Sequence, residues 1–208
     1  GHQQITEDEE IQRVAPVIEA VKARFDVPVS IDTYKAKVAA AAIEAGADLV
    51  NDIWGLKYDP EMAGLIARTG VACCLMHNKN NTEYQDFYPD MLRETAECVK
   101  LAKEAGIADD KIILDPGVGF GKNYEQNLET ILHMERFHEL GYPMLLGTSR
   151  KSVIGLTLDL PADQRVEGTL VTTVMAVMKK YAFVRVHDIK ENQRTIQMTE
   201  AILRAGEN

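Results

Sequence analysis

The chain has 208 residues, a formal net charge of −9 and a hydrophobic fraction of 46%. That length is enough for one domain with a substantial core, and the composition is that of a folded protein rather than a disordered one. The acidic balance argues against partners that are themselves negatively charged, so we expect neither nucleic acids nor membrane surfaces as partners. A small anionic substrate stays compatible with it, because a few converging cations can bind phosphate inside an acidic protein.

The cysteines and the apolar runs bear on the compartment. Cys73, Cys74 and Cys98 are an odd number of thiols without the spacing of a disulfide framework, so we expect a reducing, cytoplasmic setting. No apolar run reaches about 18 residues, so we expect no membrane-spanning segment. The first residues do not resemble a signal peptide.

Short apolar runs rich in Val, Ile and Leu alternate with helical patterns along the chain. Thr6 and Glu9 fit a capping box at the start of the first helix, and Pro16 should kink it. The expected strands span residues 28–33, 49–53, 71–77, 111–116, 143–149 and 183–188. The expected helices span residues 6–24, 35–45, 62–68, 91–105, 124–140, 163–180 and 189–204, with a polar loop over 78–89. This alternation is typical of a parallel sheet that is covered on both faces.

The ends of the strands favour one of two architectures. An open doubly wound sheet brings together only the strand ends near its switch point, whereas a barrel brings all of them to one mouth. Each expected strand carries a polar residue at or near its end: Asp32, Asn51, His77, Asp115, Ser149 and His187. The sequence therefore predicts an α/β fold of the (β/α)8 TIM-barrel class. Because a whole barrel has eight strands, we expect an incomplete one, with six βα units visible and the first two strands absent. With no repeat or linker, we expect a single domain over residues 1–208.

The strongest local signal is the segment DPGVGFGK at residues 115–122. Its three alternating glycines follow a strand that ends in Asp115, and such a turn either adopts unusual backbone angles or lets a ligand approach closely. The spacing fits neither a Walker A loop nor the Gly-x-Gly-x-x-Gly motif of dinucleotide-binding folds. A ligand-binding loop and a tight turn with a capping aspartate both stay open.

A second segment, GTSRKS at residues 147–152, also follows a strand. It combines three hydroxyl groups with the cations of Arg150 and Lys151. That combination suits an oxyanion or the carbonyl of a heterocycle, although a solvated loop can have the same composition.

A third segment, RVHD at residues 185–188, places Arg185 and His187 on the same side of an expected strand. A cation inside an apolar strand is costly unless it is paired. Either a ligand site or an internal ion pair with Asp32 or Asp115 would explain it.

Asp32 and Asn51 suit a planar ring with a donor–acceptor edge. A carboxylate accepts two parallel hydrogen bonds and an amide offers both a donor and an acceptor, although Asp32 alone could merely cap the next helix. Metal and nucleophile signals are weak. His133 and His138 have the wrong helical spacing for shared ligation, and no Gly-x-Ser-x-Gly elbow occurs.

Six segments, in order, resemble the dihydropteroate synthase family. They are SIDTYKAKVA at 30–39, GADLVNDI at 46–53, LMH at 75–77, DPGVGFGK at 115–122, GTSRKS at 147–152 and RVHD at 185–188. The resemblance implies a TIM barrel, a homodimer, and a transferase of folate biosynthesis. The implied reaction condenses 6-hydroxymethyl-7,8-dihydropterin diphosphate with p-aminobenzoate and releases pyrophosphate. It implies Mg2+ as the cofactor and sulfonamides as inhibitors.

The same resemblance, carried over residue by residue, implies a site. The pterin-binding residues would be Asp32, Asn51, Ile53, Met76, Asp115, Gly147, Lys151 and Arg185. The residues that line the p-aminobenzoate site would be Phe120, Ser149 and Lys151. The diphosphate would be held by Arg185 and His187.

The catalytic residues that the resemblance implies are Asp32, Asp115, Lys151, Arg185 and His187. In the implied mechanism pyrophosphate leaves while a cation develops on the methylene carbon. The two aspartates would stabilise that cation, and Arg185, His187 and Mg2+ would stabilise the leaving anion. No general base is assigned, because the amine of p-aminobenzoate is neutral at neutral pH.

The sequence departs from the family pattern at its start. The pattern begins with a strand carrying a magnesium-contacting asparagine and continues with two mobile loops, and none of these segments is found here. We therefore expect no metal ligand in this chain. Two alternatives stay open: a pterin-binding methyltransferase domain that uses methyltetrahydrofolate, and a catalytically impaired fragment. GTSRKS and RVHD favour the synthase, because a cationic diphosphate site has no use in methyl transfer.

Overall fold

A computed structural model describes residues 5–206, which divide into two compact units. Unit 1 contains the described residues up to His77 together with Glu94–Ile113. Unit 2 contains Asn78–Arg93 and the described residues from Leu114 onward. The expectation of a single domain stays a prediction.

Within the described residues, six strands alternate with eight α-helices. The strands are β1 Ser30–Asp32, β2 Leu49–Asp52, β3 Ala72–Met76, β4 Ile112–Asp115, β5 Leu145–Leu146 and β6 Phe183–Val184. The helices are α1 Glu7–Lys22, α2 Ala36–Glu44, α3 Met62–Thr69, α4 Phe87–Glu104, α5 Tyr124–Leu132, α6 Ser152–Leu158, α7 Val166–Met178 and α8 Ile189–Ala205. Short 3-10 helices span Asp109–Lys111, Met134–Leu140 and Ala162–Gln164. None of these helices is long and apolar enough to cross a membrane.

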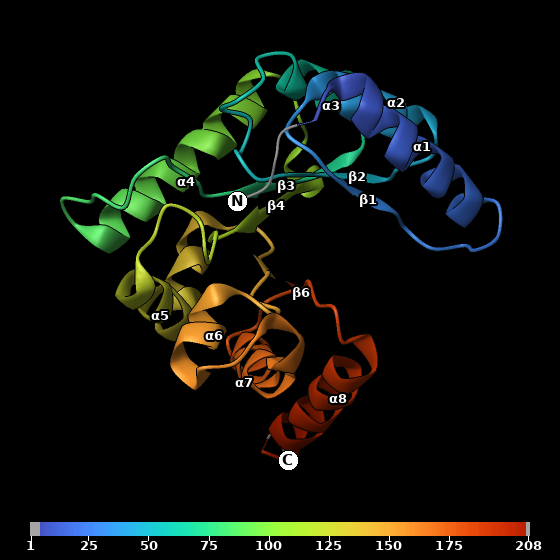
Figure 1. Ribbon diagram of the computed structural model, residues 1–208. Coiled ribbons are helices and arrows are strands. Elements are labelled where there is room, and N and C mark those ends of the chain that lie inside the picture. The colour runs from blue at the N-terminus through green and yellow to red at the C-terminus, as the bar shows by residue number, and fades with distance from the viewer. Residues whose placement is uncertain (1–4, 207–208) are drawn as a thin grey trace. The chain divides into compact units, whose positions relative to one another are not determined.

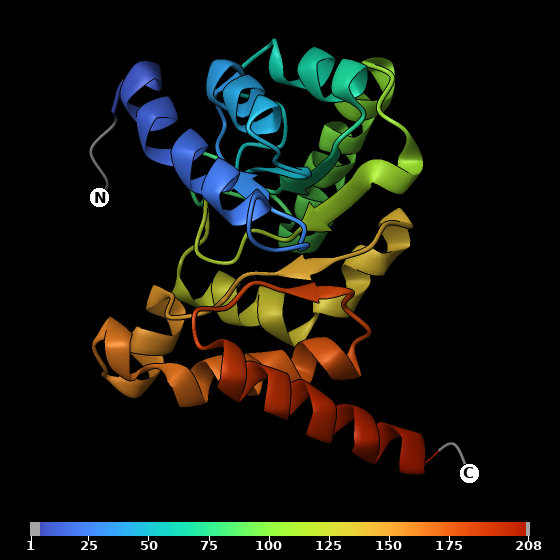
Figure 2. The same ribbon diagram turned by 90° about the vertical axis from the view of Figure 1, so that its right-hand side faces the viewer.

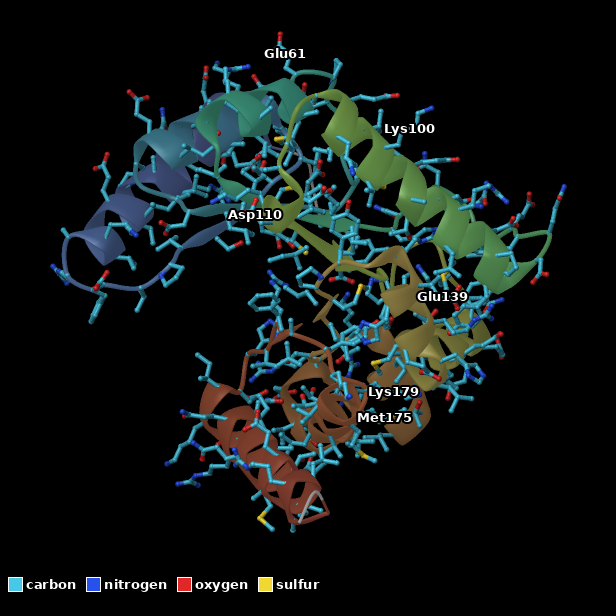
Figure 3. The ribbon with its side chains drawn as sticks, turned by 180° about the vertical axis from the view of Figure 1, so that it is seen from behind. Glu61, Lys100, Asp110, Glu139, Met175 and Lys179 are labelled. Atoms are coloured by element: carbon cyan, nitrogen blue, oxygen red, sulfur yellow. The ribbon has the colours of Figure 1, made fainter. Side chains whose placement is uncertain are left out.

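Unit 1 is a parallel sheet with helices packed on it. β1 pairs with β2 and β2 with β3, both in parallel, and Val50 of β2 and Cys74 of β3 are fully buried. Helices α1, α2 and α3 lie together on one side of these strands (Figure 1). Glu61, just before α3, and Lys100 of α4 point away from the strands into solvent (Figure 3). The helices thus bury one face against the sheet and expose a charged one, which is the pattern of a helix layer in an α/β fold.

Unit 2 contains a second parallel pair, β5 with β6. A parallel bridge from Leu114 to Met144 connects the end of β4 to the start of β5. The orange and red helices α7 and α8 lie on one side of this pair (Figure 2). Met144 and Leu146 are buried beneath them. The loops that follow these two strands carry the GTSRKS and RVHD segments.

Two helix boundaries differ most from the sequence expectation. Helix α4 begins at Phe87 rather than at residue 91, because Pro89 falls in its first turn, where a missing N–H costs no helical hydrogen bond. The expected helix over 124–140 ends as an α-helix at Leu132, and its second half is a 3-10 helix. That tighter winding places Met134 and Phe137, three residues apart, on the same buried side.

Helix α6 is the element that sequence reasoning missed, since residues 152–158 were expected to form a loop. Gly155 lowers the helix propensity of this segment, but Val153 and Ile154 are buried and their packing stabilises the helix. The strands are also shorter than expected, most of all β6, which ends at Val184.

The first helix confirms its predicted N-cap. The Thr6 hydroxyl accepts a hydrogen bond from the Glu9 backbone N–H at 3.2 Å. The Glu9 carboxylate, expected to complete a capping box, accepts from Arg13. A full capping box occurs instead at α5, where the Asn123 side chain and the Gln126 side chain each bond to the other's backbone at 2.8 Å.

Candidate functional site

The carboxyl ends of β1 and β2 place two predicted site residues side by side. Asp32 and Asn51 are register partners in the parallel ladder, so both lie at the same edge of the sheet. Asn51 is buried, whereas Asp32 is exposed. Ile53 follows the end of β2, and Met76 ends the neighbouring strand β3. The four predicted pterin-binding residues of unit 1 therefore lie at the ends of three adjacent strands.

Asp52 is a buried carboxyl group that sequence reasoning did not single out. Burial raises its pKa, and the nearby carboxylates of Asp59 and Asp32 raise it further, while hydrogen bonds from two backbone amides oppose the shift. Those amides, of Trp54 and Leu56, donate to its two oxygens at 2.8 Å each. Asp52 therefore stabilises the turn after β2, because its carboxylate accepts hydrogen bonds from backbone N–H groups for which the turn offers no carbonyl acceptor.

His77 follows β3 but is directed into the fold. It is fully buried, and its Nε2 lies 2.8 Å from a carboxylate oxygen of Glu94 in α4. This pair joins the end of β3 to α4 within unit 1. We interpret His77 as a residue that fixes the strand end rather than as a ligand-binding one.

Asp115 is the central buried charge of unit 2. Its side chain is 5% exposed, and its Oδ1 accepts from the Gly117 backbone N–H at 2.7 Å. Burial raises the pKa of Asp115, while the positive charges of Lys151, Lys122 and Arg185 and the Gly117 amide oppose that shift. A carboxylate held in such surroundings is a functional-site candidate, because burial among cations favours a ligand that donates hydrogen bonds to it.

Gly147 lies directly beside Asp115. A Cβ added at Gly147 would lie 3.5 Å from Asp115 Oδ2, which is ordinary contact. The predicted pterin-binding residues Asp115, Gly147 and Lys151 are thus brought together within unit 2.

The glycine-rich loop brings Lys151 next to Phe120. Gly117, Gly119 and Gly121 all have positive φ, at 71°, 87° and 56°. A Cβ at Gly119 would lie 3.2 Å from Lys151 Cδ, so the glycine leaves room for this side chain to lie along the loop. The Lys151 ammonium donates to the Val118 carbonyl and lies 4.7 Å from the centre of the Phe120 ring. Two of the three expected p-aminobenzoate residues, Phe120 and Lys151, are therefore in contact, and the loop adopts the angles that its glycines permit.

Two residues hold this loop that sequence reasoning missed. The ammonium of Lys122, itself buried, donates to the carbonyl oxygens of Gly117 at 3.1 Å and Phe120 at 3.0 Å. Asn127 accepts from the Gly119 N–H at 2.5 Å through its side-chain oxygen. The only sequence signal for Lys122 was its place at the end of DPGVGFGK, and nothing marked Asn127.

Ser149 and His187 are hydrogen-bonded to each other. The Ser149 hydroxyl accepts from the His187 backbone N–H at 3.2 Å and lies 2.9 Å from His187 Nδ1. Beside them, the Arg150 guanidinium makes a two-point ion pair with Asp188, at 2.6 and 3.2 Å. The loops after β5 and β6 are thereby cross-linked twice.

The sequence suggested that Arg185 lies inside a strand, but it lies just after the end of one. β6 ends at Val184, and Arg185 and His187 are exposed. The Arg185 backbone N–H still donates to Leu146 at 2.9 Å, which continues the β5–β6 ladder by one bond. Because its side chain is exposed, Arg185 does not carry the free-energy cost of a buried cation.

Residues 5–206 contain no group of three or more His, Cys, Asp or Glu side chains placed to hold a metal ion. The two residues expected to hold a diphosphate, Arg185 and His187, both lie on the exposed segment after β6 in unit 2.

Comparison with known proteins identifies the family. Residues 1–187 match the model of the pterin-binding enzyme family. The chain is 59% identical over 205 residues to dihydropteroate synthase of Clostridium beijerinckii, covering 98% of this chain and 76% of that protein. It is 49% identical to the enzyme of Bacillus subtilis, covering 99% of this chain and 72% of that protein.

Solved structures agree with this assignment. A Clostridium difficile dihydropteroate synthase crystallised with pteroic acid matches with a TM-score of 0.95 and 45% identity, over 97% of this chain and 77% of that one. A Yersinia pestis dihydropteroate synthase in complex with a sulfonamide drug matches with a TM-score of 0.93 and 39% identity, over 97% and 76%. These similarities confirm the α/β, TIM-barrel fold class. The chain belongs to the dihydropteroate synthase family of pterin-binding enzymes.

Proposed function

We propose that this protein is a transferase of folate biosynthesis, which condenses 6-hydroxymethyl-7,8-dihydropterin diphosphate with p-aminobenzoate to form 7,8-dihydropteroate and pyrophosphate. The observation that carries the proposal is the buried Asp115 beside the Lys151 ammonium and the glycine-rich loop. Relatives at 38 to 59% identity that bear the name dihydropteroate synthase support it.

The pair of Asp115 and Lys151 suits the pterin ring. The carboxylate would accept hydrogen bonds from the 2-amino group and the adjacent ring N–H, and the ammonium would donate to the oxo group. A buried carboxylate has lost its hydration, so it gains most from a ligand that replaces both hydrogen bonds. Arg185 would stack on the ring, and Gly147 would leave space beside the carboxylate.

On the family resemblance alone, we also propose Asp32, Asn51, Ile53 and Met76 as pterin-binding residues. Asn51 offers both a donor and an acceptor for ring nitrogens, and Ile53 and Met76 offer apolar surface for the ring. Asp32, which is exposed at the end of β1, would stabilise positive charge on the methylene carbon.

The remaining residues suit the leaving group and the second substrate. Arg185 and His187 would hold the diphosphate, and the hydrogen bond between Ser149 and the His187 ring orients that ring for the task. Phe120, Ser149 and Lys151 would line the p-aminobenzoate site. Positive charge aimed at the departing pyrophosphate stabilises the transition state more than the substrate, which is what accelerates the reaction. The described residues offer no metal cluster, so an Mg2+ requirement rests on the family resemblance alone, and chelation with EDTA tests it.

The function is tested by titration and turnover. We expect the protein to bind the pterin diphosphate in a calorimeter and to release pyrophosphate only when p-aminobenzoate is present. Lys151→Met should lower the affinity about 10-fold or more, because it removes a charge-assisted hydrogen bond. Lys190→Met, on the exposed start of α8, is the matched control and should bind like the wild type.

Each alternative gives a different result in these assays. A protein that transfers a methyl group from methyltetrahydrofolate and ignores p-aminobenzoate would support the methyltransferase reading. Binding of the pterin diphosphate without any release of pyrophosphate would support a catalytically impaired protein. Sulfonamides should compete with p-aminobenzoate, and a failure to compete would argue against the proposed second-substrate site. Cys73, Cys74 and Cys98 are buried and are not joined in disulfides, which supports the proposal that the protein works in the reducing cytoplasm.

We also propose a homodimer that forms through α7 and α8. The large exposed apolar residues of these helices are Val171, Met178, Ile189, Met198, Ile202 and Leu203. A groove of about 370 Å³ runs between the two helices, and Met175, labelled in Figure 3, lines a neighbouring one of about 240 Å³. Exposed apolar surface of this kind is typical of protein interfaces. Light scattering should give twice the monomer mass, and Met198→Glu should lower it to that of a monomer. A wild-type protein that is monomeric at micromolar concentration would refute the proposal.

A further inference from the structure

Arg150, the residue before Lys151, has an unfavourable backbone conformation. Its φ is +60°, in the left-handed region that side chains other than glycine rarely adopt. Such a conformation persists only where the surroundings determine it, and it tends to occur where a protein must aim a functional group. Here it turns the chain just before Lys151, whose ammonium reaches the Val118 carbonyl beside Asp115.

Three groups hold Arg150 in this conformation. Thr169 of α7 accepts from its backbone N–H at 3.3 Å, and Asp188 pairs with its guanidinium. Arg165 donates from Nη1 to its carbonyl oxygen at 2.8 Å. Of the three, only Arg165 also reaches the backbone of the next residue, through a bond to the Lys151 carbonyl at 3.3 Å.

The Arg165 guanidinium lies in a space that Gly155 provides. Its Nε donates to the Leu160 carbonyl at 2.9 Å, so the group serves three carbonyl oxygens along one stretch of chain. A Cβ at Gly155 would lie 2.1 Å from Arg165 Nη2 and 2.2 Å from Cζ, a separation that no structure tolerates. The glycine inside α6 thus has a specific reason: it lets the planar guanidinium lie flat against the helix.

We propose that Arg165 is a positioning residue for Lys151. By fixing the carbonyl groups of Arg150 and Lys151 it sets the direction in which the Lys151 side chain leaves the backbone, and so places the ammonium between Phe120 and Val118. The inference rests on the proposed function for its role in pterin binding. Its geometric part, that Arg165 aims Lys151, does not depend on which ligand the protein takes.

The geometric part is tested by NMR without any ligand. The Lys151 ammonium lies 4.7 Å from the Phe120 ring centre, so the resonances of its ε-methylene should carry a ring-current shift in protein labelled with 13C-lysine. In Arg165→Met this resonance should move to the position of an exposed lysine. Gly155→Ala should have the same effect, because the added methyl group displaces the guanidinium. Gly64→Ala, in helix α3, is the matched control: its nearest neighbour is 3.7 Å away, and the resonance should not move.

The functional part is tested by a double-mutant cycle with pteroic acid as the probe. Arg165→Met should lower the affinity about 10-fold, as the loss of one aligned charge-assisted contact would. In a Lys151→Met background the same change should alter affinity less than about twofold, because a residue that acts through Lys151 has nothing left to position. A merely structural defect would add to the loss instead.

The outcomes are distinct. An unshifted Lys151 resonance in Arg165→Met overturns the inference, as do losses of affinity that multiply in the double variant. If Arg165→Met does not fold, Gly155→Ala gives the same readings, since it displaces the guanidinium without removing it. A wild-type protein that shows the shifted resonance but does not bind pteroic acid refutes the proposed function and leaves the positioning role standing.

Discussion

Asp115→Asn is expected to be at least as stable as the wild type at neutral pH and to lose most of its affinity for a pterin. Burial raises the pKa of Asp115 above its ordinary value of 3.8. A carboxyl group with a raised folded-state pKa binds protons more tightly in the folded protein, so stability falls as the pH rises from the unfolded-state pKa through the folded-state one. Asparagine is neutral at every pH, which removes this cost, and its oxygen can still accept from Gly117.

The loss of affinity should be about 100-fold or more. Two hydrogen bonds from the pterin to a charged acceptor are each worth roughly 1.5 to 3 kcal/mol, and the asparagine amide presents an N–H where an acceptor is needed. Thermal unfolding between pH 4 and pH 8, together with calorimetric titration of pteroic acid, measures both effects. An Asp115→Asn protein that binds pteroic acid normally would remove Asp115 from the site.

Asp48→Asn is the matched control with the opposite sign. A hydrogen bond from the Val29 backbone N–H at 2.7 Å and an ion pair with Lys22 at 3.0 Å lower the pKa of Asp48. That stabilisation is present above the unfolded-state pKa and is lost as the pH falls through the folded-state one. The variant should therefore be less stable at neutral pH and should bind pteroic acid like the wild type. Reduced stability in both variants would show that the raised pKa of Asp115 carries no cost to folding.

Gly121→Ala is expected to destabilise the protein by about 3 kcal/mol or more. Two penalties combine here. The φ of +56° costs a residue with a Cβ about 1 to 2 kcal/mol. In addition, the Cβ would lie 2.8 Å from the Lys79 carbonyl oxygen and 3.0 Å from its backbone nitrogen, and main-chain atoms cannot move aside as a flexible side chain can. Urea unfolding gives the free energy.

Gly141→Ala separates the two penalties. Gly141 also has a positive φ, of 78°, but nothing lies within 4 Å of the position of its Cβ. It should cost only about 1 kcal/mol, the price of the backbone conformation alone. Equal losses in the two alanine variants would mean that the contact between Gly121 and Lys79 does not constrain the loop.

The sequence predicted the order of the elements well and their limits less well. Every expected strand exists, because buried runs of branched apolar residues are distinctive. The errors arose where tertiary contacts override local preference. Residues 87–89 were assigned to a loop, although α4 begins at Phe87, and the glycine in α6 concealed a helix that its buried neighbours stabilise.

The candidate site shows the same difference between residues in local sequence motifs and residues placed by tertiary contacts. Asp115, Phe120 and Lys151 could be proposed in advance, because they stand in the motifs that carry the family resemblance. Lys122, Asn127 and Arg165 could not be assigned their roles, since each bonds to backbone atoms of residues that only the fold brings within reach. Every residue has a backbone carbonyl group, so a side chain that bonds to backbone atoms requires no particular residue type in its partner. A sequence pattern therefore cannot reveal such a contact.

The double cross-link between the loops after β5 and β6 has an evolutionary consequence. Ser149 bonds to His187 and Arg150 pairs with Asp188, so a change on one loop leaves an unsatisfied group on the other. Paired substitutions in these segments should be tolerated better than single ones. A protein that changes one loop first would pass through a less stable intermediate. Across related sequences we therefore expect the two loops to vary together, at a slower pace than the exposed helices around them.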